Sequence, residues 1–342
     1  MPIRFARQEK IARFLDPRAD FQEVAVSCEV RWDPLTGRTG RIAHVAGFQL
    51  VPPDLAPLIE ASLTFCPFCP DKIMTITTKF PAEITPAGRF QRGEAVLFPN
   101  IAPYDEHSAV AAICQQHYVP MGQFSQAILH DAFEVCLDYL RRVRSLPHTS
   151  YPLVFWNYLP ASGGTQIHPH LQLFATDTPG NAVQDEMAAG QRYFQEHGRA
   201  FWGDLLQEEE RLGERFVARG QHSAWLTSFI SQSVLADLLI VFPGQYTLYD
   251  LSEAALDEFC RGLTQVLPAL EARGIYSFNL GFFSGVAGRE DTWLRARLSP
   301  RIYMTPRLWG SDTSSLQQLY QEHFMVQTPE TLAEQVRGAL TL

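Results

Sequence analysis

The sequence predicts an α+β fold in which two similar units form one continuous molecule. Hydrophobic residues make up 46% of the 342 residues and aromatic residues 12%, which is enough to build a substantial core. Strand-like runs alternate with long amphipathic stretches of helical period. The order of these elements in the first half of the chain recurs in the second half, and such a recurrence is typical of a duplicated unit.

Strand-like runs separated by Pro and Gly turns open the first half. They cover residues 21–32, 73–80, 94–98 and 109–115. A helix is expected over 125–146, because apolar residues such as Ile128, Phe133 and Leu137 recur there at helical spacing. A strand at Tyr151–Tyr158, a Gly-bearing loop and a second strand that carries two histidines complete this half.

The second half begins with a strongly charged stretch, 179–218, which is expected to form solvated helices. A helix should follow over 252–273, with Asp250 or Ser252 as its N-cap. Strands are then expected at Tyr276–Phe283 and Thr292–Tyr303, with a Gly-rich loop between them.

The two halves correspond most clearly at their last strands. The segment Leu294–Ser299 falls where Ile167–Gln172 falls in the first half. A final helix is expected to begin at Thr328-Pro329-Glu330, where a proline suits the first turn. We therefore predict two domains, 1–178 and 179–342.

Charge and cysteine content exclude several classes of protein. The net charge is −9 and no block is rich in Lys or Arg, which argues against a nucleic-acid-binding surface. The segment MPIRFARQEKIARFLD lacks the apolar core of a signal peptide, and no apolar run approaches the length of a membrane span. Six cysteines in a chain of this size do not indicate a disulfide scaffold. We expect a cytoplasmic protein with reduced thiols.

The most informative motif is His168-Pro169-His170-Leu171-Gln172. In a strand, side chains two residues apart share a face, so both histidines and the glutamine should point one way while the leucine points into a core. The loop Ser162-Gly163-Gly164-Thr165 precedes the motif. Two imidazoles and an amide beside such a loop are suited to binding a phosphate, and one imidazole could attack phosphorus. The alternative is a surface turn with two solvated histidines.

The second motif is Cys66-Pro67-Phe68-Cys69. A C-x-x-C pair can bind one metal ion, usually zinc, with two further ligands from elsewhere in the chain. A redox pair would be expected between a strand and a helix, whereas Ile73, Thr75 and Thr77 alternate as in a strand. The motif therefore favours zinc over a redox pair or two ordinary buried thiols.

Together these motifs resemble galactose-1-phosphate uridylyltransferase and its relatives, the nucleotidyltransferase branch of the histidine triad (HIT) superfamily. The segment from Arg31 to Gly37 is similar to the family's early R-x-N/D-P-L-T-G signature, and Phe98-Pro99-Asn100 is similar to the strand end that holds the nucleotide. The resemblance extends across most of the chain. It implies duplicated HIT-like units, each an antiparallel sheet with flanking helices.

The resemblance also implies a role for each matching residue. His170 matches the nucleophile, and Gln172 matches the amide that steadies the phosphoryl group. The residues implied to contact the nucleotide and its phosphates are Phe98, Asn100, Asn157, Gly163 and Thr165. A structural zinc ion is implied, with Cys66, Cys69 and His168 as ligands. The remaining ligand in the family is a histidine just after a strand; His117 suits it best and His107 is the second choice.

The chain departs from the family pattern at three places. A basic R-A-x-R-P segment is replaced by residues 44–49 (HVAGFQ), and the segment that contacts the hexose is matched only loosely around Gln321–Gln327. The second-half H-x-H, which binds a further metal in some members, is replaced by Arg295 and Arg297, so no second metal site is expected. These arginines could meet phosphate or lie on a solvated strand edge. The departures argue against UDP-galactose as the substrate.

The activity implied is nucleotidyl transfer. Neutral His170 would attack the α-phosphorus of a nucleotide-sugar-like donor, and a phosphorylated acceptor would then take the nucleoside monophosphate from the histidine. Backbone N–H groups around Gly163 and Gly164, together with the Gln172 amide, would hold the phosphoryl oxygens. A backbone carbonyl should accept a hydrogen bond from the other nitrogen of His170.

Other functions remain open at this point. A phosphorylase would use inorganic phosphate as the acceptor and act on nucleotide-sugars or dinucleoside polyphosphates. A hydrolase would use water, and a zinc-stabilised nucleotide-binding module would have no turnover. A homodimer is implied by the resemblance.

Overall fold

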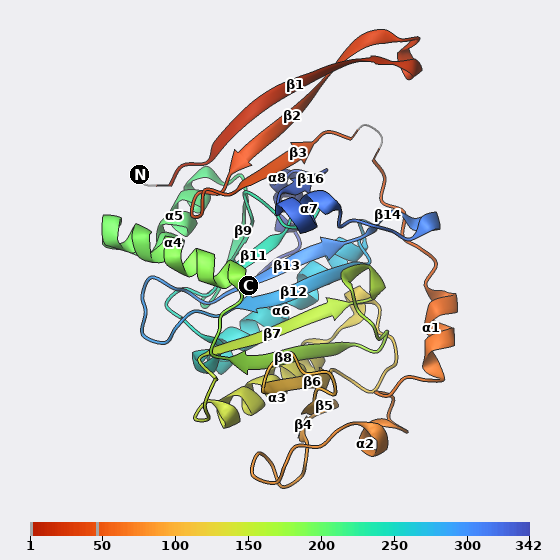
Figure 1. The fold of residues 1–342 in the computed structure, drawn as a ribbon, viewed down its shortest axis with the longest axis vertical. Coiled ribbons are helices and arrows are strands. Elements are labelled where there is room, and N and C mark those ends of the chain that lie inside the picture. The colour runs from red at the N-terminus through yellow and green to blue at the C-terminus, as the bar shows by residue number, and fades with distance from the viewer. Residues whose placement is uncertain (1–2, 46–47) are drawn as a thin grey trace.

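The computed structural model describes residues 3–45 and 48–342. Of the segment that replaces the family's basic motif, Ala46 and Gly47 lie outside the described residues. The body of the molecule is a ten-stranded sheet, in which the strands follow the order β4-β5-β6-β8-β7-β12-β13-β11-β10-β9 (Figure 1). All neighbouring strands in it are antiparallel.

The strands of this sheet come half from each part of the chain. In the first half they are β4 (Phe90–Arg92), β5 (Ala95–Pro99), β6 (His107–Ala112), β7 (Tyr151–Tyr158) and β8 (His170–Thr176). In the second half they are β9 (Phe216–Arg219), β10 (Ala224–Thr227), β11 (Leu238–Val241), β12 (Ser277–Phe283) and β13 (Arg295–Arg301). The two sets meet where β7 pairs with β12.

The topology confirms the predicted duplication. Strand order mirrors about the β7–β12 pair, so β13 takes the place in the second half that β8 takes in the first. A long helix precedes each central strand: α3 (Gln126–Val143) before β7 and α6 (Glu253–Glu271) before β12. These helices pack together beneath the sheet, with Phe133 and Phe259 in ring contact at 5.6 Å. The division of the chain at residue 178 stays a prediction.

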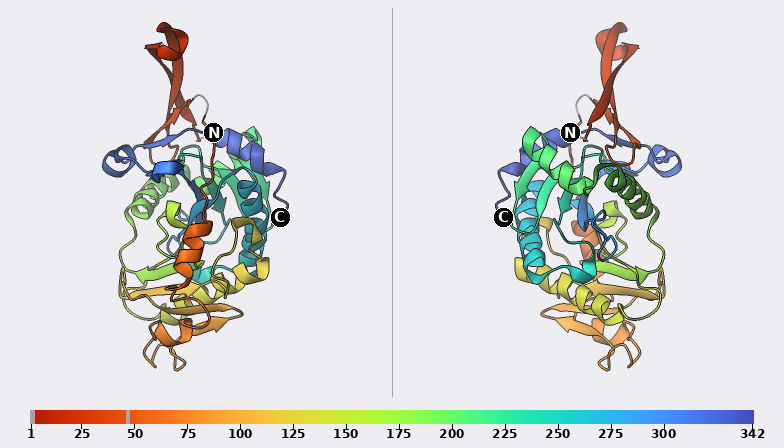
Figure 2. Two further views of the ribbon diagram at one scale, coloured as in Figure 1. Left: turned by 90° about the vertical axis from the view of Figure 1, so that its right-hand side faces the viewer. Right: turned by 90° about the vertical axis from the view of Figure 1, so that its left-hand side faces the viewer.

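A second, smaller sheet contains the N-terminal segment. It has the order β1-β2-β3-β16, formed by β1 (Ala6–Asp16), β2 (Gln22–Trp32), β3 (Thr39–Ala43) and β16 (His323–Met325). The β1–β2 hairpin projects far from the body as a two-stranded ribbon (Figures 1 and 2). No strand was predicted at β1, because its mostly polar residues do not show the alternation of a half-buried strand.

The remaining elements lie at the margins of the two sheets. The helices are α1 (Ala56–Leu63), α2 (Ile73–Ile76), α4 (Asn181–His197), α5 (Phe201–Leu212), α7 (Ser315–Tyr320) and α8 (Pro329–Arg337). The short strands β14 (Tyr303–Thr305) and β15 (Gly310–Ser311) pair with each other. Over the described residues, no helix is both long and apolar enough to cross a bilayer.

Most of the predicted elements are present, and two predictions are wrong. The stretch 179–218 does form helices, but α5 is not solvated, because Phe201, Trp202 and Leu205 are buried. Ser125 and Ser252 cap α3 and α6, and Thr328 caps α8 with Pro329 in its first turn. The strand predicted over 73–80 is instead the short helix α2. The backbone N–H groups of Lys72 and Ile73 both donate to the carbonyl oxygen of Cys69, so the chain turns tightly after the C-x-x-C pair.

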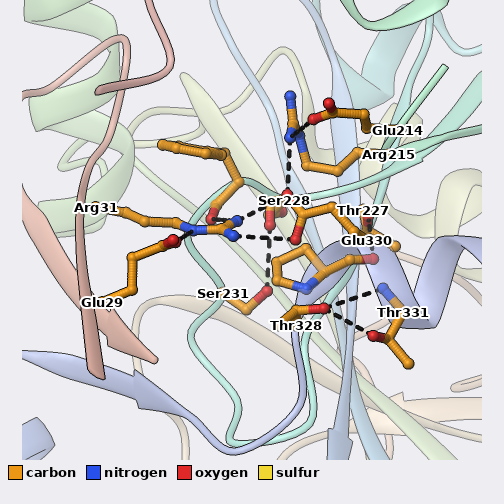
Figure 3. Close-up of polar contacts among 12 residues, drawn as sticks. Glu29, Arg31, Glu214, Arg215, Thr227, Ser228, Ser231, Thr328, Glu330 and Thr331 are labelled. Atoms are coloured by element: carbon orange, nitrogen blue, oxygen red, sulfur yellow. Dashed lines mark hydrogen bonds and ion pairs between the residues drawn. The ribbon is translucent and has the colours of Figure 1, made fainter. Parts of the chain in front are cut away.

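A buried ion network joins the N-terminal sheet to the C-terminal helix (Figure 3). Arg31 is 2% exposed and binds both carboxylate oxygens of Glu330 in α8, at 2.9 and 3.0 Å. Glu330 also accepts a hydrogen bond from Arg215 at 2.8 Å, and Arg31 pairs with Glu29 on its own strand. Arg31, the arginine of the R-x-D-P-L-T-G segment, therefore connects the N-terminal sheet to α8, although Glu330 lies 299 positions away in the sequence.

Candidate active site and metal centre

Strand β8 presents two different faces. Leu171 and Leu173 are buried in the core that α3 covers. His170 and Gln172 alternate with them and lie on the opposite, open face of the sheet. Gln172 is directly opposite Phe155 on β7, and continuing this register places Asn157 beside His170. The strand begins at His170, so His168 lies just before it.

The His170 side chain is buried and held in one orientation. Its Nδ1 lies 2.9 Å from the carbonyl oxygen of His168, which can only accept a hydrogen bond. Nδ1 therefore carries the proton, and Nε2 keeps its lone pair. Burial lowers the pKa of His170 although the bond to the His168 carbonyl opposes this, so the neutral imidazole is favoured. A nitrogen in this state can act as a nucleophile.

His170 opens into a cavity of about 500 Å³, within the usual range for a small-molecule site. One part of the cavity wall is apolar and includes Phe68, Phe98 and Tyr104. Polar side chains line the cavity as well: Thr77, Thr78, Asn100, Thr165, Gln166, His170 and Gln172. An apolar wall beside convergent polar groups is what a nucleotide requires, because its base is flat and its phosphates are charged.

The side-chain oxygens of Gln172 and Asn157 differ in whether they have a hydrogen-bond partner. The Gln172 carbonyl oxygen is buried and finds no hydrogen-bond partner within the described residues. Since an unpaired buried polar atom is costly, a bound ligand is its natural partner. The Asn157 carbonyl oxygen accepts from Asn279 of β12 at 2.7 Å. Asn279 carried no sequence signal, because its role depends on the pairing of the two halves.

The backbone N–H groups of the Gly-bearing loop were predicted to hold phosphoryl oxygens, but they form hydrogen bonds within the loop. The N–H of Gly163 donates to Pro160 at 2.9 Å and that of Gly164 to Leu159 at 3.2 Å. These donors are therefore used within the turn rather than presented to phosphate. Gly164 is needed for close approach, since a Cβ there would lie 2.8 Å from the carbonyl oxygen of Asn157. Of this loop, Thr165 lines the cavity.

The strand end predicted to hold the nucleotide does border the cavity. Phe98 is 4% exposed and packs against Phe68 with ring centroids 5.5 Å apart. The Asn100 side chain accepts from the N–H of Ala102 at 3.0 Å, which shapes the turn after β5. Phe68 was not predicted, although its place between the two cysteines beside the histidine strand could have suggested it. Its ring lies 5.4 Å from that of His170.

Four side chains converge behind this cavity in a geometry suited to one metal ion: Cys66, Cys69, His117 and His168. Their ligand atoms all lie within 4.8 Å of one another. Nδ1 of His168 is 3.6 Å from Cys66 Sγ, and Nδ1 of His117 is 3.5 Å from Cys69 Sγ. Zinc bound tetrahedrally, at about 2.3 Å from sulfur and about 2.0 Å from nitrogen, would place these atoms about 3.5 Å apart.

The hydrogen bonds of Nε2 in His117 and His168 also support a metal site. His168 Nε2 donates to the carbonyl oxygen of Cys114 at 2.8 Å. His117 Nε2 donates to Ser62 Oγ at 2.9 Å, because the Ser62 hydroxyl itself donates to Ile59. Both histidines therefore turn an unprotonated Nδ1 toward the sulfurs, as metal-binding histidines do. Burial lowers the pKa of His168 to about 4, and a neutral ring is the form that binds metal.

The structure brings His117 and not His107 to this cluster. His107 begins β6 opposite Ala175, whereas the other end of β6 lies opposite His170. Its Nε2 is 3.0 Å from the carbonyl oxygen of Pro147.

The arginines of β13 do not lie on a solvated strand edge, and each forms an ion pair within the protein. Strand β13 lies inside the large sheet, between β12 and β11. Arg295 is 4% exposed, pairs with Glu186 of α4 and stacks over Trp202 at 3.9 Å. Arg297 pairs with Asp237 at 3.1 Å. The Nε atom of Arg297 is buried and has no hydrogen-bond partner among the described residues, so only Arg295 is fully engaged by protein groups.

No family model matches the chain. In sequence, it is 26% identical over 311 residues to an uncharacterised protein of Archaeoglobus fulgidus, covering 90% of this chain and 91% of that protein. It is also 26% identical over 216 residues to a galactose-1-phosphate uridylyltransferase of Streptomyces lividans. The second match covers 62% of this chain and 56% of the uridylyltransferase.

Solved structures share the fold over nearly the whole chain. An ADP-glucose phosphorylase of Arabidopsis thaliana with bound ADP-glucose superposes with a TM-score of 0.69 at 14% identity, covering 92% of this chain and 99% of that one. A uridylyltransferase gives 0.65 at 18% identity, covering 91% and 98%. The predicted resemblance is confirmed at the level of the fold, which the chain shares with these uridylyltransferase and phosphorylase structures.

Proposed function

We propose that this protein is a nucleotidyltransferase that moves a nucleoside monophosphate from a nucleotide-sugar-like donor to a phosphorylated acceptor. The observation that carries the proposal is the state of His170. Its Nδ1 is bound to a backbone carbonyl, its Nε2 keeps a lone pair, and the residue lines a cavity of nucleotide size. The sequence match to a uridylyltransferase supports the same class of reaction.

The reaction would proceed in two displacements. Nε2 of His170 forms a bond to the α-phosphorus as the bond from phosphorus to the bridging oxygen breaks, and the phosphorylated remainder of the donor leaves. An acceptor phosphate oxygen then attacks the same phosphorus, and His170 leaves as the neutral imidazole. The His168 carbonyl stabilises the positive charge that develops on the ring, because it keeps its hydrogen bond to Nδ1 throughout.

Gln172 would contact the group in transfer. When its amide turns its NH2 group toward the cavity, it can donate to a non-bridging phosphoryl oxygen. Thr165 and Gln166 border the same region and supply further donors.

We further propose that the cluster of Cys66, Cys69, His117 and His168 binds zinc. Burial raises the pKa of Cys69 to about 11, so its thiolate form requires a cation nearby. Zinc would supply that charge and link the C-x-x-C turn to the start of β8. The His168 carbonyl that orients His170 belongs to one of the proposed ligands, so the metal would hold the nucleophile in place from behind.

The test is intact-protein mass spectrometry after mixing with UDP-, ADP- and GDP-sugars. The wild-type chain should gain the mass of one nucleoside monophosphate with one of these donors, and His170→Ala should not. Adding either inorganic phosphate or sugar phosphates should then discharge the adduct, and the acceptor that does so separates a phosphorylase from a transferase. If no donor modifies the wild-type chain, the hypothesis that remains is a nucleotide-binding module without turnover.

We also propose that the protein is a cytoplasmic homodimer. All six cysteines are free thiols, as expected in a reducing compartment. The β1–β2 ribbon extends away from the body and exposes Ile11, Leu15 and Phe21 by 61–66% of their surface. A two-stranded ribbon is marginally stable in water on its own, so contact with a second copy would stabilise it. Sedimentation analysis should give a dimer that Ile11→Lys weakens.

A further inference from the structure

A chain of hydrogen bonds connects the second half of the molecule to the strand beside His170. Strands β7 and β12 lie side by side in the large sheet (Figure 1), and Asn157 of β7 is directly opposite Asn279 of β12. Their sequence neighbours Tyr158 and Phe278 are buried in the core, so both asparagine side chains lie on the open face of the sheet. The two amides therefore meet on the face that carries His170.

Two neighbours fix the orientation of the Asn279 amide. Nη1 of Arg301 donates to the carbonyl oxygen of this amide at 2.7 Å. The NH2 group of the amide donates to the backbone carbonyl of Ser162 at 2.8 Å. A guanidinium can only donate and a backbone carbonyl can only accept, so the amide fits in one way.

The orientation of the Asn157 amide follows from that of Asn279. The Asn279 NH2 group also donates to the carbonyl oxygen of Asn157, at 2.7 Å. This oxygen is therefore turned toward β12, and the NH2 group of Asn157 lies on the side of β8, where His170 begins the strand. Within the described part of the chain this NH2 group forms no hydrogen bond, so it can donate to a ligand.

Arg301 is anchored by a carboxylate that is almost fully buried. Asp312 is 3% exposed and accepts from Nε of Arg301 at 2.9 and 3.1 Å. Asp312 also accepts from the N–H of Ile302 at 3.1 Å, which fixes the carboxylate at the end of β13. Nη2 of Arg301 donates to Thr313 Oγ1 at 2.7 Å. Because Nε and Nη2 are bound in this way, Nη1 is the atom presented to Asn279.

We propose that Arg301 is a positioning residue that orients the Asn157 amide for the reaction. Held by Asp312 and acting through Asn279, it directs the NH2 group of Asn157 toward the α-phosphoryl group at His170. The inference rests on the proposed function and adds the groups that aim one hydrogen-bond donor. An amide turned the other way would present its carbonyl oxygen to the negatively charged phosphoryl group and would repel it.

The test is a double-mutant cycle on the rate at which His170 is nucleotidylated. Whichever of UDP-glucose, ADP-glucose and GDP-mannose loads the wild type is used in single-turnover measurements. Asn279→Ala leaves the carbonyl oxygen of Asn157 without its donor and should slow loading about tenfold or more. In an Asn157→Ala background the same substitution should change the rate by less than about twofold, because no amide is left to orient.

A second variant and two controls complete the cycle. Arg301→Lys keeps a positive charge beside Asp312 but removes Nη1, so it should follow the same pattern, and it serves if the first variant folds poorly. Asn181→Ala, at the exposed start of α4, and Arg92→Lys, at an exposed ion pair with α3, are the matched controls. Both controls should leave the loading rate unchanged.

Two results would overturn the proposal. One is an equal loss of rate with and without the Asn157 amide, since Arg301 and Asn279 would then act only on the stability of the fold. The other is an unchanged loading rate in both variants.

A failure of the proposed function is a separate result, recognised by a wild type that no donor modifies. The same cycle is then measured on the dissociation constants of UMP, AMP and GMP by calorimetry. A loss of affinity in Asn279→Ala that disappears in the Asn157→Ala background would support the orientation of the amide without turnover. Additive losses, or no binding by the wild type, would overturn it.

Discussion

The ion network around Glu330 predicts a large loss of stability when one carboxylate oxygen is replaced by an amide nitrogen. Glu330→Gln keeps the shape of the side chain but removes the carboxylate that Arg31 and Arg215 share. These arginines are 2% and 1% exposed, so their charges cannot be compensated by water. Breaking a buried ion pair costs about 3–5 kcal/mol. Each arginine keeps a second carboxylate, so the lower end, about 3 kcal/mol, is expected.

This loss can be measured by thermal unfolding. With about 2.1 cal/mol/K of unfolding entropy per residue, a chain of 342 residues has about 0.7 kcal/mol/K, so about 3 kcal/mol lowers Tm by about 4 °C. Glu334→Gln is the matched control, because Glu334 is exposed on the same helix. A Tm of Glu330→Gln that matches this control would refute the network as a source of stability.

The same variant makes a pH prediction. Burial by itself would raise the pKa of Glu330, but the hydrogen bonds and charge of Arg31 and Arg215 outweigh it and lower the pKa. A carboxyl with a lowered folded pKa stabilises the protein above its unfolded pKa and loses that contribution as pH falls through the folded value. The Tm difference between the wild type and Glu330→Gln should therefore be full near neutral pH and shrink below about pH 4.3. A difference that does not change with pH would contradict this assignment.

Three further predictions concern the metal cluster, the loop and the second half. Cys66→Ser should lower the bound metal, measured by elemental analysis of the purified protein, to well below one ion per chain; full retention would exclude the cluster as the metal site. Gly164→Ala should destabilise by about 1–3 kcal/mol in urea unfolding, since its Cβ would come within 2.8 Å of a backbone oxygen, whereas Gly180→Ala, with open space around it, should change stability little. Arg295→Met should cost about 3 kcal/mol by leaving Glu186 without its buried partner, and a smaller loss than that of an exposed arginine substitution would contradict the pairing.

Local patterns predicted the fold well where packing follows from periodicity. The alternation around His170 and Leu171 and the helical spacing before Tyr151 depend on neighbouring residues alone, and both are present in the structure. The segment 73–80 failed because its alternation of Ile and Thr is also compatible with a turn that returns to the Cys69 carbonyl. Strand β1 was missed because little of its surface is buried by this chain.

The parts of the site that sequence could not predict depend on distant partners. The sequence suggested that Arg295 could bind phosphate, but in the structure it pairs with Glu186 of α4. The sequence suggested that the N–H groups of Gly163 and Gly164 could bind phosphate. It does not indicate that both groups form hydrogen bonds to carbonyl oxygens within the turn. Asn279 lies 122 positions from its partner Asn157, and only the pairing of β7 with β12 brings them together.

The central claim is that His170 becomes covalently loaded, and peptide mapping of the loaded protein tests it most directly. After a single turnover with the donor that modifies the chain, proteolysis at alkaline pH preserves the phosphorus–nitrogen bond. Tandem mass spectrometry of the peptide that contains both histidines should place the nucleoside monophosphate on His170. Finding it on His168, on another residue, or still present in His170→Ala would contradict the account.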